Sequence, residues 1–125
     1  MAVQAKQLDW AVTDEKVKEA VRRIVATADP SRVVLFGSRA RGEHRPDSDL
    51  DLAVIIDAPE EEVRQRLPRK VLQGLRMEMS LLVVSQERYD LHRPWLNSVF
   101  YSIDREGIVL YDRNDPQCAR QNAVR

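Results

Sequence analysis

One stretch of the sequence, from Gly37 to Asp51, constrains the fold more than any other. Gly37 and Ser38 follow an apolar run, Val33–Phe36, and ten residues later Asp49-Leu50-Asp51 opens a second apolar run. Each run predicts a buried strand, and Gly37 permits a tight turn with close approach of the backbone. Ser38 can cap the first turn of a short helix between the strands, where free N–H groups attract anions.

The two acidic residues at the head of the second strand are placed to share a cation. Side chains alternate along a strand, so Asp49 and Asp51 share one face while Leu50 and Leu52 occupy the other. Two carboxylates on one face repel each other unless a cation lies between them. Taken singly, a Gly-Ser turn and acidic residues at a strand entrance are common surface features. Together they predict a phosphate-binding turn beside a pair of Mg²⁺ ligands.

Helical and strand patterns alternate along the rest of the chain, which predicts an α/β (α+β) fold: a small mixed sheet packed with helices. Pro59 followed by three glutamates suits a helix start, and Pro68 predicts a break near Leu67. The expected elements are a helix over 14–28, a strand over 32–36, a short helix over 38–41, a strand over 50–56, the broken helix after 59, a strand over 78–84, a helical turn over 85–91, a helix over 96–105 and a strand over 108–111.

Length and composition narrow the function classes. The 125 residues suit one domain, which we place at residues 1–112, followed by a flexible tail over 113–125. Twenty basic and twenty acidic residues cancel, which argues against a nucleic-acid or membrane-surface partner. The longest uncharged apolar run, Met79–Val84, is too short to span a bilayer. A single cysteine, Cys118, and no visible signal peptide predict a cytoplasmic protein without internal disulfides.

The stretch GSRARGEHRPDSDLD, Gly37 to Asp51, resembles the nucleotidyltransferase superfamily typified by DNA polymerase beta, whose motif is Gly-Ser, ten residues, then Asp-x-Asp. The likeness runs from about Val33 to Asp112, because IDREGIVLYD near the end of the chain is similar to the usual ending of the family. It is closest to the minimal nucleotidyltransferases, stand-alone members often paired with HEPN-domain proteins. The resemblance implies the polymerase-beta-like nucleotidyltransferase core, with the Gly-Ser helix and the acidic pair at one end of the sheet.

The resemblance also implies roles for individual residues. Asp49 and Asp51 would be catalytic and hold Mg²⁺, Gly37 and Ser38 would cradle the β- and γ-phosphates, and Arg41 matches a basic position often found in the short helix of the family. The expected reaction transfers a nucleoside monophosphate, AMP from ATP, to an acceptor hydroxyl. Stand-alone members of this size are similar to antitoxins that modify or bind a HEPN-type toxin, which implies a toxin–antitoxin system and a hetero-oligomer.

One position departs from the pattern. Active members of the family carry a third carboxylate on the third strand, where this sequence has Ser80. Glu78 lies two residues earlier on the same strand face and has a longer reach, so it could substitute; a strand-edge surface role is the alternative. Two further hypotheses therefore stay open. One is a catalytically weak or inactive nucleotide-binding module that neutralises a partner, and the other is a small-molecule nucleotidyltransferase, although those resemble longer chains with an added helical domain.

Overall fold

A four-stranded mixed sheet forms the centre of the molecule. The computed structural model describes residues 11–43 and 48–115. The strand order is β3-β2-β1-β4. β1 (Arg32–Phe36) is antiparallel to both β2 (Leu50–Ile56) and β4 (Ile108–Asp112), whereas β2 is parallel to β3 (Met79–Ser85). The predicted small mixed sheet is confirmed.

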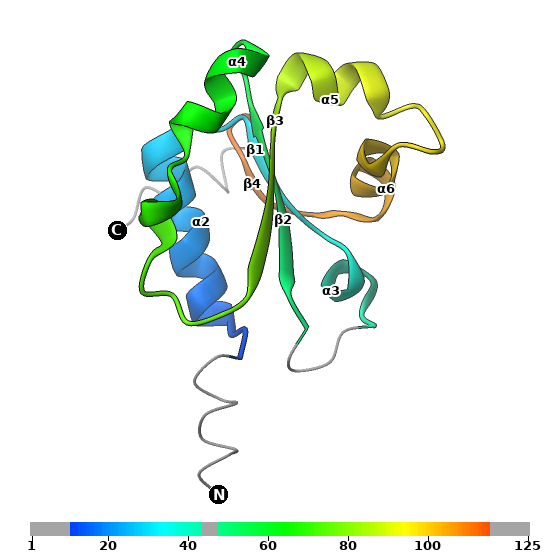
Figure 1. Ribbon diagram of the computed structural model, residues 1–125. Coiled ribbons are helices and arrows are strands. Elements are labelled where there is room, and N and C mark those ends of the chain that lie inside the picture. Colours follow the sequence, from blue (N-terminus) through cyan, green and yellow to red (C-terminus); the bar gives the residue numbers. More distant parts are fainter. Residues whose placement is uncertain (1–10, 44–47, 116–125) are drawn as a thin grey trace, which may run out of the picture.

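Helices cover both faces of this sheet (Figure 1). On one face lie α2 (Asp14–Ala28), the short α4 (Glu60–Val63) and the 3-10 turns η1 (Arg64–Arg66) and η2 (Arg69–Leu72). On the other face lie α3 (Ser38–Arg41), α5 (Gln86–His92) and α6 (Val99–Glu106). The described residues thus form three layers, and β2 is sandwiched between two sets of helices. No helix among these residues is long and apolar enough to cross a membrane.

Each sheet face has its own apolar core, because the side chains of β2 alternate between the two. Leu50, Leu52, Val54 and Ile56 pack in the cluster that includes Ile24 of α2. Ala53 and Ile55 pack in a second cluster with residues of α5 and α6, whose buried members are Val34, Ala53, Ile55, Val84, Tyr89, Phe100 and Ile103. Each fully buried Leu or Ile contributes about 1.5–3 kcal/mol. This two-sided burial explains why β2 is an almost unbroken apolar run.

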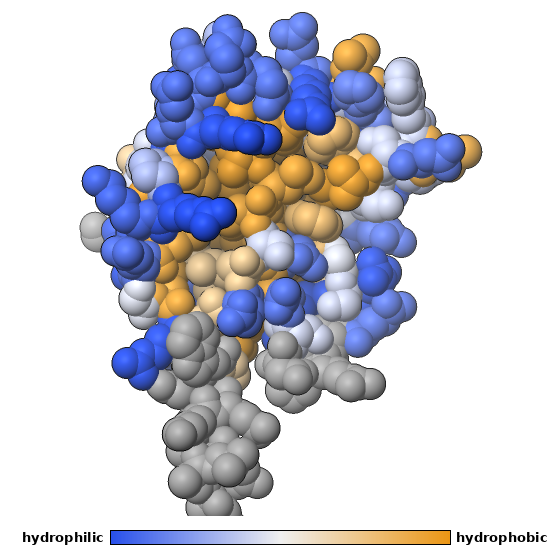
Figure 2. Space-filling model, viewed as in Figure 1, coloured by the Kyte–Doolittle hydropathy of each residue, from blue (hydrophilic) through white to orange (hydrophobic). Residues whose placement is uncertain are grey.

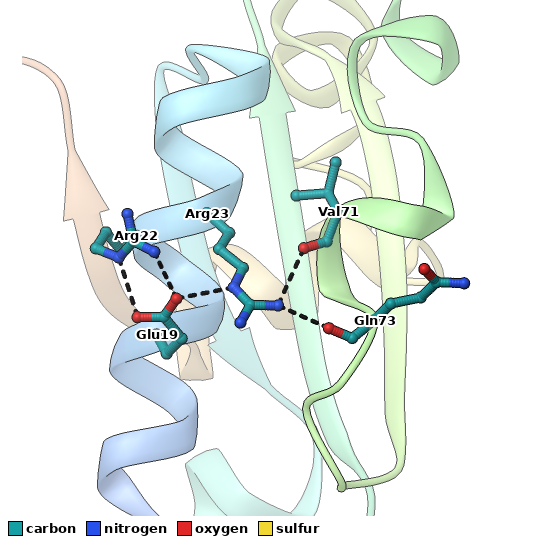
Figure 3. Close-up of polar contacts among 5 residues, drawn as sticks. All are labelled: Glu19, Arg22, Arg23, Val71 and Gln73. Atoms are coloured by element: carbon teal, nitrogen blue, oxygen red, sulfur yellow. Dashed lines mark hydrogen bonds and ion pairs between the residues drawn. The ribbon is translucent and has the colours of Figure 1, made fainter.

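Polar contacts fasten the segment between β2 and β3 onto α2. Arg23 donates through Nη1 to the carbonyl oxygens of Val71, at 3.3 Å, and Gln73, at 2.8 Å (Figure 3). Its Nε donates to Glu19, which also accepts hydrogen bonds from Arg22. The two bonds from Arg23 satisfy carbonyl groups of Val71 and Gln73 that the short 3-10 turns leave without helical partners.

The boundaries of several elements differ from the sequence prediction. The break at Leu67-Pro68 is confirmed, but the turn after it is 3-10 rather than α-helical. α6 begins at Val99, three residues later than predicted, because Ser98 caps it: Oγ accepts from the N–H of Phe100 at 3.0 Å. The third strand begins one residue later than expected, at Met79.

The predicted tail over 113–125 falls mostly outside the described residues, as does Cys118. Arg113, its first residue, donates from its backbone N–H to Ser31 at 2.9 Å and from its side chain to the Asp29 carbonyl at 2.7 Å. The division of the chain at residue 112 stays a prediction.

Candidate functional site

Gly37 and Asp51 meet at one end of the sheet. The last residue of β1, Phe36, pairs with Asp51 of β2, and the chain turns immediately afterwards at Gly37, whose φ is 79° and ψ −157°. A β-carbon at Gly37 would overlap Oδ2 of Asp51 and lie 3.2 Å from its Cγ. Only glycine combines this backbone conformation with this close approach. The turn and the carboxylate therefore form one compact unit.

The acidic pair lies on the α3 face of the sheet. Asp51 alternates with Leu50 and Leu52, which pack in the core beside α2, so its side chain points to the opposite face. Asp49, exposed just before the strand, is two residues away. The pKa of Asp51 is raised first by burial and then by the negative charge of Asp49, while Arg41 opposes the rise. The like charges thus disfavour each other, which is the electrostatic condition that a shared cation relieves.

The short helix α3 covers the predicted residues, Ser38–Arg41, but its capping residue differs from the sequence prediction. Gly37, not Ser38, is the N-cap, and its carbonyl accepts the N–H groups of Ala40 and Arg41 at 3.1 and 3.2 Å. The expectation that Ser38 caps the helix is therefore wrong: Ser38 is the first helical residue. The physical reason is that the turn needs the positive φ of Gly37 at the junction, which makes Gly37 the residue that precedes the helix.

Arg41 stands at the rim of the site and pairs with acidic side chains. Its Nε donates to Oε1 of Glu43 at 2.8 Å, and its Nη1 lies 3.9 Å from Oε1 of Glu106 in α6. The pKa of Arg41 is raised, chiefly by the hydrogen bond to Glu43, with a smaller contribution from Asp51. Arg41 therefore shares the electrostatic field of Asp51, but a bound anion would compete with Glu43 for the guanidinium.

Arg39 makes a contact that sequence reasoning did not single out. Its Nε and Nη2 both donate to the carbonyl oxygen of Ser48, at 3.2 and 3.1 Å. Ser48 immediately precedes Asp49. The two hydrogen bonds from Arg39 therefore connect α3 to the backbone from which the acidic pair projects. The sequence showed several basic residues between Gly37 and Asp49, but the direction of a side chain on a one-turn helix cannot be read from spacing. His44, Arg45 and Asp47 lie outside the described residues.

The third strand brings Ser80 beside Asp51. In the parallel register of β2 and β3, Asp51 is the Cα partner of Ser80, and the Leu50 N–H donates to the Glu78 carbonyl at 2.9 Å. Ser80 therefore occupies the position next to the acidic pair. The side chain of Glu78 is exposed, and the described residues contain no group of three or more His, Cys, Asp or Glu side chains that could hold a metal. Glu78 does not complete the acidic pair in this conformation.

The residues present nevertheless fit Mg²⁺ in one particular way. Mg²⁺ is commonly held by one or two carboxylates together with substrate phosphates and water. Asp49 and Asp51 supply two carboxylates, and the pKa of Asp51 is raised first by burial and second by the charge of Asp49. The missing side chain at Gly37 leaves room for the Asp51 carboxylate itself, which lies directly against the turn. The donor set suits an ion that arrives with a phosphate substrate better than an ion caged by protein alone.

Solved structures define the fold class. The chain is similar to a Sulfolobus solfataricus protein provisionally described as a nucleotidyltransferase, with a TM-score of 0.51, 19% identity and coverage of 79% of each chain. It is also similar to a toxin–antitoxin complex solved with AMP-PNP, with a TM-score of 0.50, 20% identity and coverage of 90% of this chain and 82% of that one. At these identities the likeness establishes the fold.

Sequence comparison then establishes the family. Residues 14–110 match the family described as nucleotidyltransferase domain, and the chain therefore belongs to it. The family expected from the sequence is confirmed. No curated protein matches the chain in sequence.

Proposed function

We propose that this protein is a minimal nucleotidyltransferase that transfers AMP from ATP to an acceptor hydroxyl. The observation that carries the proposal is the contact between Gly37 and the Asp51 carboxylate, with Asp49 projecting from the head of the same strand. Asp49 and Asp51 would hold Mg²⁺, which when bound polarises the α-phosphate and neutralises the pyrophosphate leaving group. The acceptor hydroxyl oxygen forms a bond to the α-phosphorus and loses its proton to solvent, while the bond from that phosphorus to the pyrophosphate oxygen breaks.

The turn residues have supporting roles in this proposal. Gly37 and Ser38 would lie against the β- and γ-phosphates, because the absence of a side chain at Gly37 lets the backbone approach the ligand. Arg41 would exchange its bond with Glu43 for a phosphate oxygen, since a guanidinium matches phosphate geometry in two-point contacts. Arg39 would hold the Ser48–Asp49 backbone in place while the ligand binds.

A second candidate function is a nucleotide-binding module with weak or absent catalysis. It is favoured by Ser80, which pairs with Asp51 where a carboxylate could activate the acceptor hydroxyl. A neutral hydroxyl cannot act as an anionic base, and loss of general-base assistance typically costs about 10²–10⁴-fold in rate. Under this alternative the protein neutralises its partner by binding alone.

The partner in either case is proposed to be a HEPN-type toxin, which makes this protein an antitoxin in a cytoplasmic hetero-oligomer. Support comes from the likeness to the toxin–antitoxin complex that contains AMP-PNP.

A labelling experiment distinguishes the two functions. The protein is co-purified with its partner and incubated with Mg²⁺ and α-labelled ATP, in parallel with Asp49→Asn/Asp51→Asn. Transfer of label to the partner by the unchanged protein alone supports the enzyme. A stable complex that carries no label supports the binding module, and recovery of the protein without any partner contradicts the antitoxin assignment.

A further inference from the structure

Among residues 11–43 and 48–115, no strand pairs with one long edge of the sheet. In the strand order β3 has β2 on one side only. The hydrogen bond from Leu50 N–H to the Glu78 carbonyl fixes which backbone groups of β3 face β2, namely those of even-numbered residues. The N–H and C=O groups of Met79, Leu81 and Val83 therefore point away from the sheet. At Ser85 the outward N–H already donates to Oε1 of Glu60, at 3.2 Å.

This edge lacks the usual protection against pairing. Residues 79–85, MSLLVVS, contain no charge, proline or glycine, and the β2–β3 register is continuous. The opposite edge strand, β4, is shorter, its register with β1 shifts between Val33 and Val34, and its last residue Asp112 is paired with Arg32 at 3.5 Å. Bulges, charges and short length keep natural edge strands from pairing. β4 has these features and β3 does not.

The side chains along the open edge are apolar. Leu81 is 36% exposed, although it lies mid-strand, and Met79 and Val83 are half-buried against the core beside α2. Figure 2 shows an apolar area where Figure 1 draws β3, with hydrophilic side chains around it. An apolar strand with outward-facing backbone groups is suited to accept another strand.

We propose that β3 pairs antiparallel with β3 of a second copy of this chain, about a two-fold axis at Leu81. In this register Leu81 lies opposite Leu81 of the second copy, and Met79 lies opposite Val83 of the second copy. Every outward N–H and C=O group of these three residues then makes a hydrogen bond between the copies. A register shifted toward the end of the strand would need the Ser85 N–H, which Glu60 already occupies. The two sheets then become one continuous sheet.

The occupant is a second copy because the two edges complement each other. Both supply three outward pairs of backbone groups at the same spacing and apolar side chains on the same face. The residues flanking β3 are Arg76 and Glu78 at one end and Glu87 and Arg88 at the other. Each end carries one acid and one base, so antiparallel pairing brings no block of like charge together.

The pairing does not depend on the proposed function. Leu81 belongs with Met79 and Val83 to the face beside α2, whereas Ser80 belongs with Leu82 and Val84 to the face on which Asp51 lies. Loss of Mg²⁺–ATP binding and loss of the dimer are therefore separate outcomes.

The mass in solution tests the proposal. Light scattering of the purified full chain at micromolar concentrations is expected to give twice 14.4 kDa. Leu81→Lys places two like charges on the axis and is expected to give a single chain mass with native circular dichroism. The control is Leu96→Lys, at an apolar side chain that is 75% exposed away from β3, and it is expected to stay dimeric. A monomeric unchanged protein, or a dimer that Leu81→Lys leaves intact, overturns the proposal.

A cross-link tests the register even where Leu81→Lys fails to fold. In a Cys118→Ser background, Leu81→Cys places two thiols on a hydrogen-bonded antiparallel pair, about 5.5 Å apart at Cα, within reach of a disulfide. Mild oxidation is expected to yield a covalent dimer from Leu81→Cys and not from Leu96→Cys. Equal cross-linking of both variants, or cross-linking of neither, contradicts the pairing. Pairing of β3 with a different protein also contradicts it.

Discussion

Gly37 lies directly against the carboxylate of Asp51, so that a single added carbon would overlap Oδ2. Two residues fourteen positions apart in the sequence thereby form one structural unit at the end of the sheet. The glycine is required by its backbone angles and by its neighbour at the same time. The proposed phosphate-binding turn and the proposed metal ligands are consequently sensitive to the same substitutions.

Gly37→Ala is expected to weaken Mg²⁺–ATP binding and to destabilise the fold. Its φ of 79° and ψ of −157° lie in a region that is nearly exclusive to glycine, at a cost of about 1–3 kcal/mol. Gly42→Ala is the matched control, since Gly42 also has a positive φ, 74°, but a β-carbon there meets nothing within 4 Å. Calorimetric titration and thermal melts of both variants separate strain from loss of the site. Equal ATP affinity in Gly37→Ala and Gly42→Ala contradicts the role of Gly37.

Arg39→Lys is expected to reduce Mg²⁺–ATP affinity about 3- to 10-fold, although it preserves charge. The two donors that Arg39 directs at the Ser48 carbonyl become one flexible ammonium, with a loss of the order of 0.5–1.5 kcal/mol in hydrogen bonding. Arg22→Lys serves as the control, because Arg22 pairs with Glu19 within α2 rather than with a residue of the candidate site. Unchanged affinity in Arg39→Lys shows that Arg39 does not position Asp49.

Glu19→Gln is expected to lower stability at neutral pH and to have little effect in strong acid. Hydrogen bonds from Arg22 and Arg23 lower the pKa of Glu19 from 4.5 to about 2. A carboxyl with a lowered pKa in the folded state stabilises the fold above its ordinary pKa, and the contribution is lost as the pH falls from about 4.5 toward 2. Melting temperatures of both proteins between pH 2 and 7 check this prediction. The prediction is contradicted if the melting temperatures of the two proteins differ by the same amount at every pH.

Ser80→Asp is expected to raise the rate of AMP transfer by about 10²-fold or more if the missing carboxylate limits the chemistry. Ser80 is the register partner of Asp51, so the new carboxylate would face the acceptor hydroxyl. A contact made only in the transition state appears in kcat rather than in KM. Glu78→Gln is the companion variant. Strong transfer by the unchanged protein that only Glu78→Gln abolishes would assign the role to Glu78 instead.

Much of the fold could be predicted because its signals are local. The apolar runs Val33–Phe36 and Leu50–Ile56 predicted β1 and β2, and Pro68 predicted the break that the structure shows beside Leu67. The alternation of Asp51 with its apolar neighbours correctly separated the two faces of β2. These features depend on residues a few positions apart.

Features that depend on three-dimensional packing could not be predicted. The sequence does not reveal that β3 lies at an edge or that β1 lies between β2 and β4, because pairing joins distant residues. The N-cap at Gly37 depends on the turn imposed by the Phe36–Asp51 pairing. The direction of Arg39 toward Ser48 and of Arg41 toward Glu43 is set by neighbours that the sequence alone does not bring together.

Mg²⁺-dependent ATP binding tests whether Asp49 and Asp51 form the nucleotide site. Calorimetric titration of ATP is made with and without Mg²⁺, on the unchanged protein and on Asp49→Asn/Asp51→Asn, with thermal melts to establish that both are folded. Tight binding is expected only for the unchanged protein with Mg²⁺, because the two carboxylates hold the ion that the triphosphate brings. If the folded double variant binds Mg²⁺–ATP as well as the unchanged protein, Asp49 and Asp51 do not form the nucleotide site.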